Sequence, residues 1–474
     1  MSRSKSLMAF PEIKSRSKEL FSMSLPMMVE HLALSVMGMI STMLVSTIGE
    51  YAQAALGMVD SISNLIIALF AALTVGGTIV VAQYFGKQDL QSAKRAGGQA
   101  VLLSVIFSGA MFLLLFFFRV QILGFLFGDA EAAVMDAALT FLAIVSFSFP
   151  VLAATQTIFG LLRGSGDTLT PMVISIAMNV VNLALGFVLI RGFDFGFVTI
   201  PSFGVAGAAA ALLVTRVLGM IAALLFIVKK ARGIRLNRLR FFKPNPPMQK
   251  TILRLGMPNS IESGLFQGGR LITQIFIVWI STAAMATNTI AGSIVMFINV
   301  PGNALSIGAM ILVGQRIGRG QESDVRRTAL FATAAASVMF AALCFVMFFL
   351  QGPIVGLFSP SDDALAYLPA VYISNLIATP LVWASAFVLP AALRATGDVV
   401  YPMVVSVSTM IVVRVALSYV FAIVMGMGVL GVWLAMYLDW AARSAFFIPR
   451  ILGNKWRGKG ISASKNDDEV QMET

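Results

Sequence analysis

The sequence contains one cysteine, Cys344, and one histidine, His31, among 474 residues. A single cysteine cannot form a disulfide within the chain, and together the two residues argue against a zinc site. Charged residues are scarce as well, at 12%, which is about half the fraction typical of soluble domains. With 58% hydrophobic residues and a mean hydropathy of +0.88, the composition predicts a polytopic membrane protein.

Recognisable nucleotide-binding motifs are also missing. The sequence has neither a P-loop nor a glycine-rich dinucleotide-binding motif, which disfavours an ATP-driven pump. Its few carboxylates are scattered, and no paired acid–base cluster lies near a membrane interface. This scatter argues against a membrane enzyme and predicts no cofactor beyond a coupling ion, H⁺ or Na⁺.

Long apolar segments dominate what is present. Twelve of them can each cross about 30 Å of hydrocarbon as a helix, so we predict an all-α fold with twelve transmembrane helices. Several exceed the minimum length, which indicates tilted or protruding helices. The segments are 21–48, 54–83, 98–118, 132–158, 171–190, 205–228, 257–281, 286–314, 328–351, 363–392, 401–424 and 430–449.

Positive charge is strongly biased to one side of these segments. Of the 34 Lys and Arg residues, 28 lie in the two terminal segments and in every second loop. The alternate loops hold only Arg119 and Arg191. Because basic residues mark the cytoplasmic side, we expect a plasma-membrane protein with both termini in the cytoplasm. The net charge of +12 therefore reflects topology, and nucleic acid is not an expected partner.

The chain divides into two lobes of six helices. We predict a cytoplasmic N-terminal segment (1–20), an N-lobe (21–228), a basic inter-lobe loop (229–256), a C-lobe (257–449) and a cytoplasmic tail (450–474). The loop is the longest polar stretch, and its basic residues can contact anionic membrane lipid. Residues 464–474 are expected to be a disordered tail.

The two lobes are copies of one pattern. LRGSGDT at 162–168, followed by Pro171, matches LRATGD at 393–398, followed by Pro402. Gly166 and Gly397 can supply the turn, Asp167 and Asp398 can cap the next helix, and the prolines fit its first turn. Arg163 and Arg394 complete this structural motif.

The repeat extends to the first helices of each lobe. Residues 26–95 align without a gap on 258–327, 232 positions later, and the identities include Glu30/Glu262 and Gly76/Gly308. Six spans in each copy give both lobes the same orientation, related by an axis along the membrane normal. This arrangement suits a transporter with a central site between the lobes. Because a single chain already supplies both lobes of the pathway, a monomer is expected.

Charged groups within membrane spans indicate functional sites because they are costly to bury. The carboxylates are Glu30, Asp60, Glu262 and Asp439. Glu30 and Glu262 occupy the same repeat position, so they are the leading candidates to bind a proton or a cationic substrate. The alternative is that each stabilises the start of its helix.

The remaining candidates lie on the same or neighbouring spans. Gln267 and Arg270 follow Glu262 on its helix and can line a cavity, Arg270 being too far from Glu262 to pair directly. Asp439 and Arg443 have the i, i+4 spacing of a structural ion pair. Two amides in the fifth span, Asn179 and Asn182, can bind substrate or form hydrogen bonds between helices. Asp60 in the second span is a further candidate to bind substrate.

These motifs resemble the multidrug and toxic compound extrusion (MATE) family over roughly residues 15–455. The resemblance is carried by the two Arg-Gly-Asp turns, by VAQYFG at 81–86, by VGQRIG at 313–318 and by VWLA at 432–435 with Asp439, Trp440 and Arg443. It implies two lobes around a V-shaped cavity. It also implies export of cationic or amphipathic compounds in exchange for protons or sodium.

The ion-coupling carboxylates of this family are replaced here. The resemblance places Ser41, Gly186 and Trp383 where branches of the family have Asp in the first, fifth and tenth spans. Asn182 remains beside one of these positions. A seventh-span Glu is a theme of the family that Glu262 matches, so Glu262, with Glu30, is the expected coupling site.

Other functions compete with efflux of drugs. A flippase or exporter of a lipid-linked or amphipathic metabolite belongs to the same superfamily, and Arg216 and Arg270 within spans favour an anionic substrate. A membrane enzyme would need a cluster of reactive residues near the interface, and this sequence does not contain one. A channel or receptor does not need the two-lobe repeat. We therefore expect a secondary active transporter of a small-molecule drug or metabolite.

Overall fold

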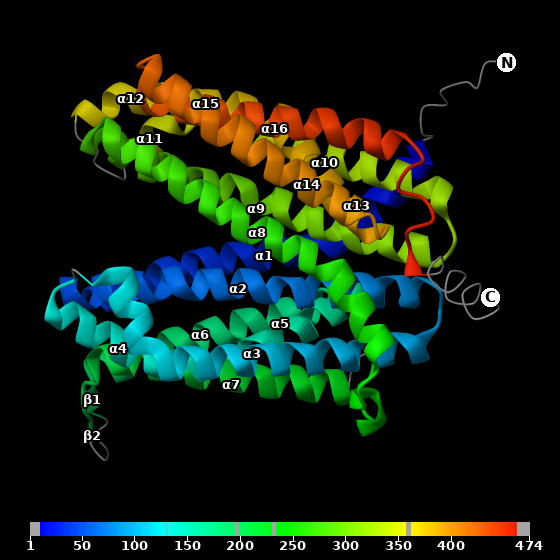
Figure 1. The fold of residues 1–474 in the computed structure, drawn as a ribbon, viewed down its shortest axis with the longest axis horizontal. Coiled ribbons are helices and arrows are strands. Elements are labelled where there is room, and N and C mark those ends of the chain that lie inside the picture. The colour runs from blue at the N-terminus through cyan, green and yellow to red at the C-terminus, as the bar shows by residue number, and fades with distance from the viewer. Residues whose placement is uncertain (1–9, 129, 195–198, 230–233, 357–361, 462–474) are drawn as a thin grey trace. The chain divides into compact units, whose positions relative to one another are not determined.

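The computed structural model describes residues 10–128, 130–194, 199–229, 234–356 and 362–461, which are almost entirely helical (Figure 1). Within these ranges two short strands, β1 (Phe193–Asp194) and β2 (Thr199–Ile200), pair antiparallel. The predicted disordered tail at 464–474 lies outside the described residues.

The helices of the first half have the following bounds: α1 Phe10–Ser46, α2 Glu50–Gly86, α3 Leu90–Phe127, α4 Ala132–Ser146, α5 Ser148–Gly164, α6 Leu169–Arg191 and α7 Gly204–Lys229. A 3₁₀ turn, η1 (Leu239–Phe242), follows in the inter-lobe loop. The helices of the second half are α8 Pro246–Ile280, α9 Thr282–Gly318, α10 Glu322–Phe349, α11 Gln351–Gly356, α12 Asp362–Ala378, η2 Thr379–Trp383, α13 Ala384–Ala395, α14 Val400–Thr409, η3 Met410–Val415, α15 Ala416–Tyr419, η4 Val420–Val424 and α16 Gly428–Leu452.

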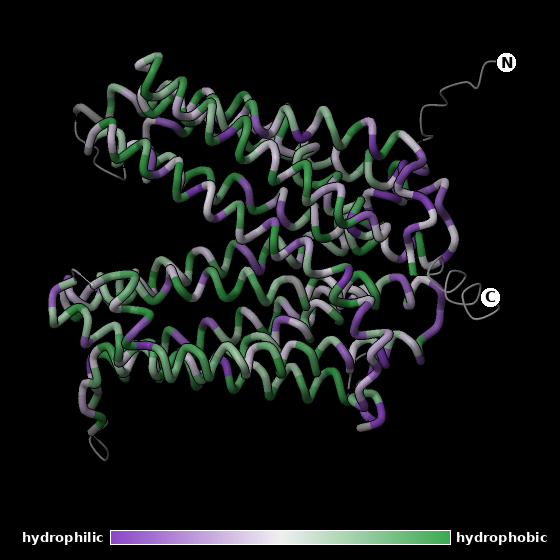
Figure 2. The backbone as a smooth tube through the Cα atoms, in the orientation of Figure 1, coloured by the Kyte–Doolittle hydropathy of each residue, from purple (hydrophilic) through white to green (hydrophobic). Residues whose placement is uncertain are grey.

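Each predicted span coincides with one helix or with consecutive helical pieces, which confirms the all-α membrane fold. Nine helices in the described part are long and apolar enough to cross a membrane, and α4 with α5 forms a tenth span bent by 48°. The two other long helices, α8 and α16, carry intramembrane charges such as Glu262 and Asp439. Figure 2 shows apolar residues along the helices and hydrophilic residues gathered at helix ends and connections.

Three segments among the described residues of the C-terminal half are π-helical. Thr379–Trp383 contains Pro380, and Met410–Val415 contains Arg414. Val420–Val424 is the third. A π turn adds a residue to the helical repeat, shifts the side chains that follow, and is frequent at functional sites. Helix α9 runs unbroken through Pro301.

The chain forms two compact units that differ from the predicted lobes at three points, namely the starts of α1 and α8 and the connection at 86–88. One unit contains 1–28, 86–88 and 261–474, and the other contains 29–85 and 89–260. The start of α1 therefore packs within the unit of the C-terminal helices. The start of α8 packs within the unit of the N-terminal helices. The other boundaries follow the two sequence repeats closely.

Two repeat-related glycines make room for these helix starts. A Cβ at Gly76 would meet the carbonyl oxygen of Ile252 and lie 3.1 Å from the backbone nitrogen of Gly256. A Cβ at Gly308 would meet the hydroxyl of Ser24. Ser260 on α8 also donates a hydrogen bond to the carbonyl of Leu69 at 2.9 Å. The two glycines thus let helix α8 or α1 pack closely on a neighbour within one unit.

Candidate functional site

The two Arg-Gly-Asp turns share a glycine of positive φ, but their aspartates have different partners. Gly166 and Gly397 have φ of 94° and 92°, which only glycine adopts readily. Asp167 accepts a hydrogen bond from the backbone N–H of Thr170 at 3.0 Å, so it caps α6 as expected. Asp398 is buried and binds two cations, Arg450 at 2.8 Å and Lys459 at 2.6 Å.

The arginine of the first turn binds Glu30. Nη2 of Arg163 donates to both carboxylate oxygens of Glu30, at 2.8 and 2.7 Å. The hydroxyl of Ser175 on α6 donates to the same carboxylate at 2.8 Å. Glu30 is only 3% exposed, so these partners take the place of water around its carboxylate. Asn179 is connected to this group, because its amide donates to the carbonyl of Ser175 at 2.8 Å.

The second repeat forms the same ion pair in the other unit. Nη2 of Arg394 lies 2.6 Å from Glu262, and both side chains are nearly buried. In both copies the arginine Nε is buried and has no hydrogen-bond partner. Each repeat therefore joins the carboxylate of its first helix to the turn that precedes its fifth span.

Sequence reasoning missed these partners of Glu30 and Glu262. It placed Arg163 and Arg394 in a turn motif and treated the glutamates as a separate coupling site. A signal was present, since each arginine follows its glutamate by nearly the same number of residues in both repeats.

A second charged group lies on α16 and the adjoining π-helical segment. Nε of Arg443 donates to Asp439 at 2.9 Å, the pairing that their spacing predicts. Arg443 also donates to the carbonyl of Ser406 at 3.2 Å. Asp439 is fully buried and Arg443 is 2% exposed. The guanidinium groups of Arg443 and Arg414 both lie near the ring of Phe266, at 5.3 and 5.5 Å.

The other predicted site residues make weaker contacts. Arg270 donates to Gln267 at 3.4 Å on the same helix, and Arg270 is exposed. Asp60 is exposed too, and Arg216 is its electrostatic partner. Asn182 is half-buried and makes no side-chain hydrogen bond within the described residues.

Two of the three positions where the resemblance replaces carboxylates, Gly186 and Trp383, are packed against apolar groups. Gly186 is buried, and a Cβ there would lie 3.3 Å from the side chain of Leu44. Trp383 stacks on Phe387 with ring centroids 4.5 Å apart. Among the described residues no group of three or more His, Cys, Asp or Glu side chains could hold a metal ion.

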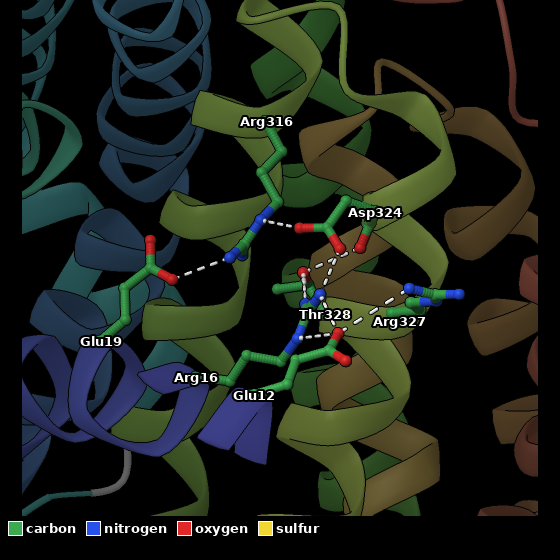
Figure 3. Close-up of polar contacts among 7 residues, drawn as sticks. All are labelled: Glu12, Arg16, Glu19, Arg316, Asp324, Arg327 and Thr328. Atoms are coloured by element: carbon green, nitrogen blue, oxygen red, sulfur yellow. Dashed lines mark hydrogen bonds and ion pairs between the residues drawn. The ribbon is translucent and has the colours of Figure 1, made fainter. Parts of the chain in front are cut away.

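A further ionic network fastens the start of α1 within its unit (Figure 3). Arg16 binds Glu12 at 2.9 Å, Thr328 at 3.2 Å and also Asp324. Arg316 bridges two carboxylates, Glu19 at 2.7 Å and Asp324 at 2.6 Å, as Figure 3 shows. Sequence reasoning assigned 1–20 to a separate cytoplasmic segment and did not foresee this network. Only the i, i+4 spacing of Glu12 and Arg16 was visible in the sequence.

Comparisons with known proteins bear on both halves of the chain. The sequence model of the MatE family matches residues 26–188 and 258–420, ranges separated by the 232 positions of the internal repeat. An uncharacterized transporter of Bacillus subtilis, YisQ, is 28% identical over 94% of this chain and 96% of its own length. A probable multidrug resistance protein of Thermotoga maritima, NorM, is 25% identical over 97% of each chain.

Solved structures agree on the fold. A MOP superfamily transporter from Pyrococcus furiosus superposes with a TM-score of 0.83 at 21% identity, covering 93% of this chain and 97% of its own. An outward-facing multidrug resistance transporter gives a TM-score of 0.82 at 20% identity, covering 92% and 95%. These likenesses establish the architecture of twelve helices in two lobes.

Proposed function

Since the chain belongs to the MatE family of multidrug and toxic compound extrusion transporters, we propose that it exports cationic or amphipathic drugs and toxic compounds in exchange for protons or sodium. Transport proceeds by alternating access. The membership is supported by a family match over both repeats. The observation that carries the coupling proposal is the repeated buried pair, Glu30 with Arg163 and Glu262 with Arg394.

The geometry of the pairs suggests how an ion acts on them. As long as Glu262 is ionised, it neutralises Arg394 and holds the first helix of its repeat against the turn. A proton or Na⁺ on the carboxylate removes the attraction between the two groups, so separating them costs much less than separating an intact pair. The freed guanidinium then has to find water or another anion. Glu30 acts in the same way in the first repeat, where Ser175 also holds it.

Substitution of Glu262 by Gln tests this proposal. Proteoliposomes are loaded with a fluorescent cationic drug, and its efflux is followed after a proton gradient or a sodium gradient is imposed separately. With the parent chain, one of the two gradients should accelerate drug efflux. With E262Q, efflux should be no faster than from protein-free liposomes, because Gln cannot bind the proton or Na⁺. Glu50→Gln, at an exposed position beginning α2, is the matched control and should behave as the parent.

Two results would contradict the proposal. Efflux by the parent chain that ignores both gradients would favour the flippase or exporter of an amphipathic metabolite, a reading supported by arginines within the spans. Gradient-driven efflux that survives in E262Q would leave Glu262 with the structural role of holding Arg394. Recovery of E262Q in a monodisperse gel-filtration peak separates loss of coupling from loss of folding.

We also propose a partner for the inter-lobe loop, namely the headgroups of anionic membrane lipid. Two adjoining hollows of about 350 and 280 Å³ lie between the start of α3 and η1. Their linings include five cationic side chains and no carboxylate: Lys94, Arg95, Arg238, Arg240 and Lys243. Gln99 shapes the loop by donating to the carbonyls of Phe241 and Lys243 at 2.9 and 2.8 Å.

Removal of two of these cations should weaken lipid binding. Each basic residue near an anionic surface contributes about 1 kcal/mol, so R238Q/R240Q should bind phosphatidylglycerol about thirtyfold more weakly than the parent. Native mass spectrometry of the monomer titrated with this lipid measures the change. The control R319Q/R327Q removes the same charge from exposed positions in the other unit and should bind as the parent. Equal weakening in both variants would indicate general charge attraction and refute a lipid site at the loop.

A further inference from the structure

We infer that Arg414 belongs to a binding site for an anionic group, a carboxylate or phosphate, on the molecule that the protein transports. The inference rests on the proposed transport function and narrows its substrate class. Arg414 lies in the helical stretch from Val400 to Val424. At roughly 1.5 Å per residue the side chain is about 20 Å along that stretch, deep within a span. The π-helical segment Met410–Val415 contains it.

Arg414 is almost buried, at 9% exposed, and its Nε has no hydrogen-bond partner. Within the described residues no hydrogen bond or ion pair satisfies the other nitrogens either. Its guanidinium carbon lies 5.5 Å from the centre of the Phe266 ring. A buried, unpaired charge is costly, which makes a ligand the natural partner.

Neighbouring charges do not satisfy Arg414. The charged groups that act on it are Asp439, Arg443 and Arg270. Asp439 uses one oxygen to bind Arg443 and leaves the other buried without a hydrogen bond. Three guanidinium groups therefore share one carboxylate, and the local charge is positive. In the ion pairs of Glu30 and Glu262, by contrast, every arginine has its own carboxylate.

The arrangement specifies the chemistry of the ligand. A guanidinium group binds a planar carboxylate or a phosphate through two parallel hydrogen bonds. Phe266 lies near both Arg414 and Arg443, so it provides an aromatic surface beside the charged groups. The expected ligand is an amphipathic organic anion or zwitterion whose acidic group lies next to an aromatic or apolar part. Phosphate from a membrane lipid shares this chemistry.

A pair of dyes that differ in one group tests the inference. Rhodamine B has a free carboxylate, and its ethyl ester is a plain cation with the same ring system. The full-length protein in nanodiscs of neutral lipid should bind rhodamine B more tightly, by about tenfold for one charge-assisted hydrogen bond. R414Q should lose this preference, and R414K should keep part of it, because lysine retains the charge without the planar fork.

Control variants make the result specific. Arg119 also lies over a phenylalanine, with its Cζ 5.0 Å from the ring of Phe116, but it is in the other unit. R119Q should therefore keep the preference of the parent. D439N removes the competing carboxylate and should strengthen the preference for rhodamine B. Monodisperse gel filtration of each variant, and binding of the ester by R414Q, show that the fold is intact.

The outcomes separate this inference from the proposed function. Gradient-driven export of the ester, with no preference for rhodamine B, would overturn the anionic site and leave the proposed function standing. A preference that depends on Arg414, without gradient-driven transport, would do the reverse. The titration is repeated in nanodiscs containing phosphatidylglycerol. Loss of the preference there would show that lipid phosphate holds the site, and would overturn its assignment to a transported molecule.

Discussion

Replacing Arg163 with Gln should destabilise the protein by about 3–5 kcal/mol, because it leaves the buried carboxylate of Glu30 without its cation. Ser175 alone remains to bind that carboxylate. The reverse change, E30Q, leaves Arg163 with a neutral partner and should also be costly. The double variant E30Q/R163Q removes both charges and should cost less than the sum of the two single changes.

The second repeat provides the matched control. Arg394 and Glu262 form the same pair, but their side chains are 14% and 13% exposed, against 12% and 4% for Arg163 and Glu30. A carboxylate with more access to solvent loses less when its cation is removed, so R394Q should be less destabilising than R163Q. Thermal unfolding of the purified proteins in one detergent, followed by intrinsic fluorescence, ranks the four variants. Equal melting temperatures for R163Q and the parent would show that the pair contributes nothing to stability.

Gly76→Ala should destabilise by about 1–3 kcal/mol, the usual cost of overpacking, whereas Gly308→Ala should be neutral or stabilising. The added methyl group at position 76 meets backbone atoms of Ile252 and Gly256, which no rotamer change can move away. At position 308 it meets the hydroxyl of Ser24, which is buried but makes no hydrogen bond. That side chain can rotate without losing a bond, and alanine favours the helix by up to about 1 kcal/mol over glycine.

The two alanine variants can be compared directly because they occupy the same repeat position. Melting temperatures in detergent and the fraction of monodisperse protein after heating measure the difference. A larger decrease in melting temperature for G308A than for G76A would contradict this prediction. It would mean that the start of α8 can shift as a whole to accommodate the methyl group at position 76.

Much of the architecture followed from local sequence. Apolar segments of membrane length predicted all the spans, because a helix in hydrocarbon must satisfy its own backbone and expose apolar side chains. The repeated motifs predicted turns at Gly166 and Gly397, because glycine tolerates positive φ, and both residues have it. The family resemblance also came from these contiguous motifs, and the match to both halves agrees with it.

The partners of the charged residues did not follow in the same way. Glu30 was identified as a candidate, but its binding to Arg163 joins residues 133 positions apart. Asp398 was expected to cap a helix as Asp167 does, yet it binds Arg450 and Lys459 from the segment after the last span. The two copies of the motif therefore acquired different contacts, because Arg450 and Lys459 pack beside Asp398 in the second copy.

The sequence by itself determined the membrane class, the twelve spans, the internal repeat and the short list of charged residues that a bilayer makes conspicuous. Hydrophobicity, turn geometry and the scarcity of charge are local properties, so they can be read without a structure. Tertiary packing alone decided that the starts of α1 and α8 join the unit of the other repeat, that both glutamates have arginine partners, and that Arg414 has none among the described residues. The physical reason is that the energy of a buried charge depends on which distant groups the fold brings within a few ångströms of it.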